Sequence, residues 1–260
     1  MDNKFHTGMK GSQSKSSQGT GRTRAFQHTL WSRVLVAGGI DSPQSRQAIE
    51  ELCRLYWFPI YAFLRRAGHD RQVARDLVQG FFTYLLEREL LGKANPERGR
   101  FRSFLIGVLK NYVRGEQEKK NAISRGGGVE VISIDEEVAE GRYAHEPATS
   151  LTPEKLFDRR WALQVLEQAM DRLQGEYARS NMKDVFVELQ PYLSGDGEYG
   201  FAELGARLSK SEGAARVLVH RFRERFRHYI RAVIADTVSD LEQVEIELKH
   251  LQAALRNDGM

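Results

Sequence analysis

Apolar residues along this 260-residue chain recur at every third or fourth position, and only rarely at alternate positions. The first spacing places them on one face of an α-helix, whereas half-buried strands alternate apolar and polar residues. VEVISIDEE, at residues 129–137, is the one stretch that resembles a strand. We therefore predict an all-α fold of two small helical domains joined by a flexible acidic linker.

Changes in composition divide the chain into five parts. We expect a disordered basic tail over residues 1–25, a first domain over 26–125, a linker over 126–151, a second domain over 152–235 and an amphipathic helical extension over 236–260. The tail is rich in Gly, Ser and Lys, a composition typical of disorder. A triple glycine opens the linker, which is predominantly acidic.

Prolines and capping residues mark where the expected helices begin. Helical spacing over residues 26–38 predicts a first helix, and Pro43 follows a serine in the arrangement typical of a second helix start. Pro59 should kink or interrupt that second helix. Asp70 is expected to open the next helix, and Thr152 the first helix of the second domain.

Charge is unevenly distributed along the chain, although the net charge is only +4. Residues 54–125 hold 15 Lys and Arg against 7 Asp and Glu, and residues 207–231 hold 8 against 2. Residues 126–158 hold 2 against 8, and residues 236–258 hold 2 against 6. Two basic blocks separated by an acidic one indicate two surfaces for a polyanion; the alternative is that each block is a solvated face.

The second basic block lies in an expected helix-turn-helix. FAELGARL, at residues 201–208, predicts a short helix, and a tight turn at Ser209 and Lys210 leads into a long one. Ser209 and Glu212 have the spacing of a capping box at its head. At about 100° per residue, basic residues gather on the side opposite the apolar face. They are Arg216, His220, Arg223 and Arg227, flanked by Arg221 and Arg225.

A basic stripe of this kind suits the major groove of DNA, where arginines reach guanine edges or phosphates. A surface helix that is merely rich in arginine is the alternative. Within the first basic block, residues 99–120 interleave aromatic and cationic side chains. That pattern is typical of single-stranded DNA binding, but aromatic side chains packed inward and cations directed outward would give it too.

Three segments, taken in order, resemble bacterial RNA polymerase sigma factors of the extracytoplasmic-function type over residues 26–235. RDLVQGFF matches the segment that docks on the clamp coiled coil of the polymerase. FRSFLIGVLKNYVRGE matches the helix that captures the melted promoter, and SEGAARVLVHRFRERFR matches the helix that reads the more distant promoter element as duplex. TLWSRVL, PERGRFRSFL and the triple glycine resemble one subgroup of these factors.

The resemblance implies roles for the residues at matching positions. Those expected to bind the polymerase are Asp76, Leu77, Gln79 and Phe81. Those expected to face the melted single strand are Phe101, Arg102, Phe104, Lys110, Asn111 and Arg114. Those expected to contact duplex promoter DNA are Arg216, Val217, His220, Arg221 and Arg223.

Four positions depart from the family pattern, one of them Lys210, which replaces a usual apolar turn residue. Arg75 and Gly80 stand where these factors commonly have acidic residues, which bears on the polymerase contact. Ser209 replaces the usual turn glycine, and we therefore expect a positive φ at a residue with a side chain.

The resemblance implies a cytoplasmic sigma factor that binds core RNA polymerase and directs promoter recognition and opening. Its partners would be core polymerase and promoter DNA, and an anti-sigma factor or other regulator is a further candidate. We expect no enzymatic activity, because the polymerase performs the chemistry and the motifs HExxH, GxxxxGK[ST] and GxSxG are missing from the sequence. We also expect no cofactor, no metal site and no membrane insertion.

Two other functions fit the same residues. A stand-alone helix-turn-helix regulator would use its first domain for interaction, and binding of a signal there requires a closed pocket. An adaptor or anti-sigma-like protein would use the acidic linker and tail to bind proteins. The apolar residues from Leu241 to Leu255 have helical spacing, so the extension either folds back onto the second domain or pairs with another helix. The linker either mimics nucleic-acid charge within the polymerase or only separates the domains.

Overall fold

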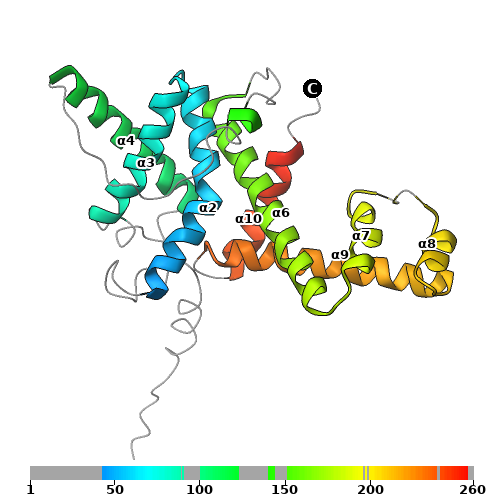
Figure 1. Cartoon of the computed structure of the whole chain (residues 1–260). Coiled ribbons are helices and arrows are strands. Elements are labelled where there is room, and N and C mark those ends of the chain that lie inside the picture. The colour runs from blue at the N-terminus through cyan, green and yellow to red at the C-terminus, as the bar shows by residue number, and fades with distance from the viewer. Residues whose placement is uncertain are drawn as a thin grey trace, which may run out of the picture.

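The computed structural model describes residues 43–88, 90, 100–122, 140–143, 151–195, 197, 199–238 and 241–256. The regular secondary structure in these residues is helical, which confirms the all-α prediction (Figure 1). The helices are α2 (Pro43–Arg66), α3 (Arg71–Glu87), α4 (Phe101–Ala122), α6 (Pro153–Arg179), α7 (Lys183–Leu189), the 3-10 helix η4 (Gln190–Leu193), α8 (Phe201–Arg207), α9 (Glu212–Ala235) and α10 (Leu241–Arg256). The expected tail, the helix expected over 26–38 and VEVISIDEE lie outside the described residues.

Local sequence signals place several helix starts. The Asp70 side chain accepts a hydrogen bond from the Val73 amide at 2.8 Å, and the Thr152 side chain accepts one from Lys155 at 3.3 Å. Both predicted starts are confirmed. Pro59 does not interrupt α2, contrary to one of the expected outcomes. The residues around it are almost fully buried, and tertiary packing of this kind outweighs a local loss of helix stability.

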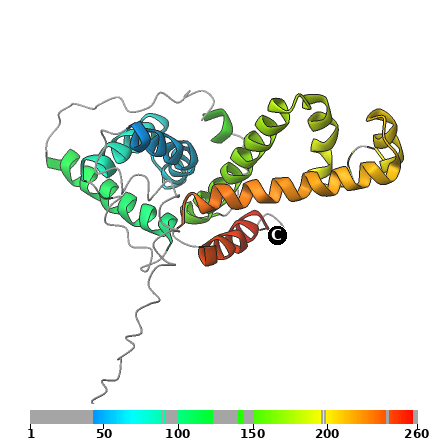
Figure 2. The ribbon, with the colours of Figure 1, turned by 90° about the horizontal axis from the view of Figure 1, so that it is seen from below.

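Two hydrophobic clusters organise the described helices. The first joins α2, α3 and α4 to the first half of α6, the end of α9 and α10, with Tyr61, Phe81 and Trp161 among its largest side chains. The second joins the end of α6 to α7, η4, α8 and the start of α9, around Phe186 and Phe222. Long helices α6 and α9 therefore run through both clusters, and α9 extends outward to α8 (Figure 2).

The two clusters do not coincide with the two domains expected from sequence. Helix α6 begins the expected second domain, yet Phe157, Trp161 and Val165 pack in the same cluster as α2. The reason lies in the length of α6, whose 27 residues carry apolar side chains along both halves. The first half of α6 therefore lies along α2, as Figure 1 shows, and only its second half supports the helix-turn-helix.

A helical turn at residues 140–143 ties part of the acidic linker to this core. Glu140 accepts hydrogen bonds from the hydroxyl of Tyr61 and, at 2.7 Å, from Arg65. Although burial opposes it, these bonds hold the pKa of Glu140 below its ordinary value. Arg142 forms an ion pair with Glu167 of α6 at 2.8 Å. This part of the linker is therefore bound to α2 and α6.

Helix α10 folds back onto the rest of the chain. Val244 and Leu251 are buried in the first cluster, where α10 packs against α6 and α9. This is the first of the two alternatives that the apolar spacing of the extension left open. Within the part of the chain that the structure covers, no helix combines the length and the apolar character needed to cross a membrane.

Candidate nucleic-acid interface

The turn between α8 and α9 is built differently from the predicted capping box. Ser211, not Ser209, caps α9, because its side chain accepts a hydrogen bond from the Ala214 amide at 3.2 Å. Ser209 lies just after α8 at φ 55°, so the predicted positive φ is confirmed and the predicted cap is wrong. The Ser209 and Lys210 amides donate to carbonyls of α8, which closes the turn.

Gly205 of α8 allows the two helices to approach closely. A Cβ atom at this position would lie 2.8 Å from the carbonyl oxygen of Lys210 and 3.1 Å from the backbone of Ser211. Separations this short are not tolerated between backbone atoms, so a larger residue would force α8 away from the turn. The sequence therefore places a glycine where the helix-turn-helix is tightest.

The first half of α9 presents four of the five residues expected to contact duplex DNA. Arg216, His220 and Arg221 are exposed, and Val217 retains 49% of its accessible surface. Arg216 lies 4.5 Å above the Phe201 ring and forms an exposed ion pair with Glu212 at 2.7 Å. No described side chain pairs with His220 or Arg221. The first half of α9 therefore exposes Arg216 beside the turn and Arg221 further along, the latter with no ion-pair partner among the described residues.

Arg223, the fifth residue, has a structural role in the described conformation. Its guanidinium donates to the carbonyl of Tyr192 at 2.8 Å and to that of Gly195 at 2.6 Å. Tyr192 lies in the last turn of η4 and Gly195 just after it, where backbone acceptors lack helical partners. Arg223 therefore holds η4 and the following loop to α9 in this conformation, and its expected contact with DNA stays a prediction.

The remaining arginines of the predicted stripe are paired. Arg225 binds Glu176 of α6 at 2.7 Å, and Arg227 pairs with Glu224 on its own helix. The hydrogen bonds from Arg225 and Tyr229 hold the pKa of Glu176 below its ordinary value, although burial opposes them. The candidate duplex-binding surface is therefore confined to the first half of α9.

Helix α4 carries the residues expected to face a single strand. Phe101 and Phe104 are half-buried and stack at 6.2 Å between ring centroids, and Phe101 also meets the edge of Tyr56. Lys110 is exposed and pairs with Glu154 of α6 at 2.7 Å. Arg114 is exposed and donates a hydrogen bond to the side chain of Asn111, also exposed, at 2.7 Å.

Arg102 of α4 is buried, contrary to the expectation that it contacts DNA. It retains 4% of its accessible surface, pairs with Asp158 and Glu247, and lies 3.8 Å above the Trp161 ring. No base or phosphate can reach it in this conformation, so the expected direct contact does not occur in the described arrangement of helices. The two carboxylates lie 56 and 145 residues further along the chain, so no local sequence pattern predicts that they pair with Arg102.

The segment expected to bind the polymerase divides into core and surface residues. Leu77 and Phe81 are buried in the first cluster, so the expected direct contact is corrected for both. Asp76 is exposed, accepts a hydrogen bond from Gln72 at 3.1 Å and lies 3.7 Å from Arg75. Half-buried Gln79 lies one turn further along α3.

Gly80, one of the departures from the family pattern, has a packing reason. A Cβ atom there would lie 2.2 Å from the hydroxyl oxygen of Tyr112 on α4. Tyr112 packs against Phe81 and Tyr84 of α3, at 5.9 and 5.2 Å between ring centroids. An acidic side chain at Gly80 would therefore displace Tyr112 and loosen the α3–α4 contact.

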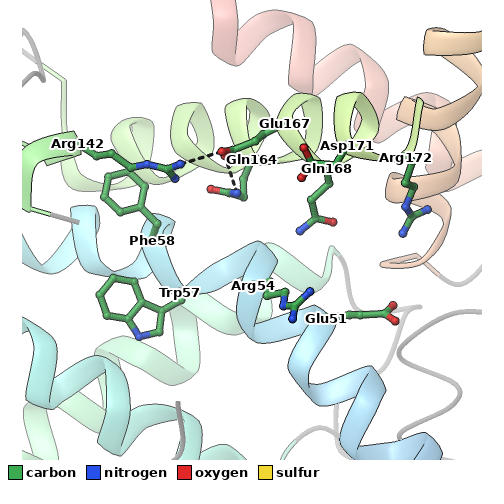
Figure 3. Close-up of a pocket in the computed structure, with 10 residues that line it drawn as sticks. All are labelled: Glu51, Arg54, Trp57, Phe58, Arg142, Gln164, Glu167, Gln168, Asp171 and Arg172. Carbon is green, nitrogen blue, oxygen red and sulfur yellow. Dashed lines mark hydrogen bonds and ion pairs between the residues drawn. The ribbon is translucent and has the colours of Figure 1, made fainter. Parts of the chain in front are cut away.

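A groove between α2 and α6, with a volume of about 460 Å³, lies outside these surfaces (Figure 3). Its charged residues have both signs, and several of them form ion pairs, as Arg142 does with Glu167 and Arg172 with Asp236. A small cavity of about 20 Å³ lies among α2, α3 and α4. Ligand pockets have hundreds of Å³, so this cavity does not provide the closed pocket that a signal-binding first domain requires.

Comparisons with known proteins add no name to this arrangement. The chain matches no protein-family model, no curated protein and no solved structure.

Proposed function

We propose that this chain is a helix-turn-helix protein that reads duplex DNA with the first half of α9. The observation that carries the proposal is the exposed surface of the first half of α9, where His220 and Arg221 have no described partner. An α-helix fits the major groove, where each base pair presents a distinct pattern of donors and acceptors. Arg221 supplies a donor fork for guanine or phosphate, and Val217 supplies an apolar contact for a thymine methyl group.

Within this class, we infer that the protein is a sigma factor of the extracytoplasmic-function type. Support comes from the order of three sequence segments, which lie on α3, α4 and α9. Asp76 and Gln79 present polar groups on α3 for contact with the polymerase clamp. Phe101 and Phe104 form an aromatic pair on α4, and aromatic rings stack on unpaired bases. The partner enzyme supplies the chemistry, and this chain supplies promoter selection and opening.

Phosphate contacts and base contacts are expected to have different roles in DNA binding by α4 and α9. Lysines and arginines of both basic blocks bind phosphates, which gives affinity that falls steeply with salt concentration. Base identity is read by a few side chains of α9 and by unpaired bases at α4. Loss of a single phosphate contact therefore weakens binding to all sequences, whereas loss of a base contact changes which promoters are used.

Binding to core polymerase tests the proposal directly. We expect the full chain to copurify with sigma-free core polymerase, and Asp76→Ala to reduce that affinity by about tenfold, the effect of about 1.4 kcal/mol. Asp76 is exposed and has only side-chain contacts on its own helix, so its loss should not disturb the fold. The matched control is Asp184→Ala on α7, an equally exposed carboxylate far from α3. Equal core affinity of both variants would contradict the assigned polymerase contact.

A further inference from the structure

The cations of α4 are bound by carboxylates that lie beyond the linker. Lys110 pairs with Glu154 near the start of α6 at 2.7 Å, and this hydrogen bond holds the pKa of Glu154 below its ordinary value. Arg102 pairs with Asp158, one turn later on the same helix. It also pairs with Glu247 of α10, at 2.6 Å from its terminal nitrogen and 2.9 Å from Nε. Carboxylates thus occupy positions at α4 where the proposed function would place DNA phosphates.

The Arg102–Glu247 pair is the most deeply buried of these ion pairs. Arg102 and Glu247 retain 4% and 3% of their accessible surface. The Trp161 ring, itself fully buried, covers one face of the guanidinium at 3.8 Å. A charge in such a place must keep a partner, because an uncompensated buried charge is strongly unfavourable. The Lys110–Glu154 pair is half exposed and contributes little by itself.

Apolar contacts hold α10 in position to supply Glu247. Val244 and Leu251 are buried on either side of it along the helix, and α10 packs on α6 and α9 (Figure 1). Arg231 of α9 reaches Glu245 at 3.2 Å, an exposed pair that does not involve α4. Arg102 is therefore enclosed by three separate segments of the chain: α4 itself, the first half of α6, and α10.

We propose that α6 and α10 mask the nucleic-acid face of α4 in the free protein, with Glu247 as the anchoring carboxylate. This proposal rests on the proposed function, because it concerns the α4 surface assigned to the melted strand. Release of α10 exposes Arg102, and a phosphate then replaces Glu247 as its anionic partner. The free chain accordingly binds single-stranded DNA weakly, and the surface becomes available when a partner draws α10 and α6 away from α4.

The test compares two charge-removing variants of the same helix in the full chain. Glu247→Gln removes the buried carboxylate, whereas Glu245→Gln removes the exposed one, so the change in net charge is identical. The probe is a fluorescent oligothymidylate of about 16 nucleotides, followed by anisotropy at low salt. We expect Glu247→Gln to bind it about tenfold more tightly than Glu245→Gln, which should resemble the unmodified chain. Amide hydrogen exchange along α10 should be faster in Glu247→Gln alone.

Each outcome decides between masking and a purely structural ion pair. Equal oligonucleotide affinities would overturn the proposal, whether or not α10 exchanges faster. Should Glu247→Gln fail to fold, Asp158→Asn takes its place, since Asp158 is about half exposed, and it must raise the affinity in the same direction. Copurification with core polymerase separates the two proposals. If the chain binds core polymerase but Glu247→Gln and Glu245→Gln bind the oligonucleotide equally, only the masking proposal is overturned. If the unmodified chain does not bind core polymerase, the sigma factor assignment is contradicted.

Discussion

Arg221→Ala is expected to weaken binding of duplex promoter DNA by about tenfold to a hundredfold, corresponding to about 1–3 kcal/mol. Arg221 is exposed on the first half of α9, and no described side chain neutralises it. Its loss therefore removes a DNA contact without leaving a protein group unsatisfied. The measurement is the affinity of the reconstituted holoenzyme for a duplex fragment on which the unmodified protein starts transcription.

The matched control for this prediction is Arg227→Ala. Arg227 is also exposed on α9 and carries the same charge, but it lies in the second half of the helix and pairs with Glu224. We expect a change of less than about threefold, because Arg227 lies beyond the half of α9 assigned to the groove and Glu224 offsets its charge. Similar losses in Arg221→Ala and Arg227→Ala would show that α9 contributes only diffuse positive charge, and would contradict groove reading by its first half.

Trp161→Ala is expected to lower the free energy of unfolding by about 3–5 kcal/mol. Trp161 is fully buried in the first cluster and covers the guanidinium of Arg102, so its removal leaves a cavity beside a buried charge. Because the cluster joins α2 to α6, protection of α2 amides should fall together with that of α6. Urea unfolding and amide hydrogen exchange measure the two effects.

Val187→Ala on α7 is the control for Trp161→Ala. Val187 is largely exposed, and its truncation should change the free energy of unfolding by less than about 0.5 kcal/mol. If Trp161→Ala destabilised α6 but left the protection of α2 unchanged, the two expected domains would be independent in stability. The shared core described here would then be wrong.

Local features of this fold were predictable because their causes are local. Asp70 and Thr152 cap helices through hydrogen bonds that span three residues. The positive φ at Ser209 was expected because this residue stands where the resembled family has its turn glycine. The capping box failed because Ser211 satisfies the same donor requirement two residues later, and a pattern of spacing alone does not separate two nearby serines.

The candidate site was predictable only where its residues act on their own helix. The exposure of Arg216 and Arg221 follows from the helical period, since the apolar face of α9 lies opposite. Arg102 has the same local surroundings as other α4 cations, but Glu247 and Trp161 reach it from distant segments. Leu77 and Phe81 belong to a matched motif, yet the apolar face of α3 carries them into the core. Motif position thus indicated the segment, and packing determined which of its side chains are accessible.

Run-off transcription with sigma-free core polymerase tests the central claim most directly. Purified full-length chain is added to core enzyme and a library of genomic fragments, and the 5′ ends of the transcripts are mapped. We expect defined start sites on a subset of fragments, which are lost when the chain is omitted and are shifted or lost with Arg221→Ala. Transcripts that begin at the same scattered positions with and without the chain would contradict it.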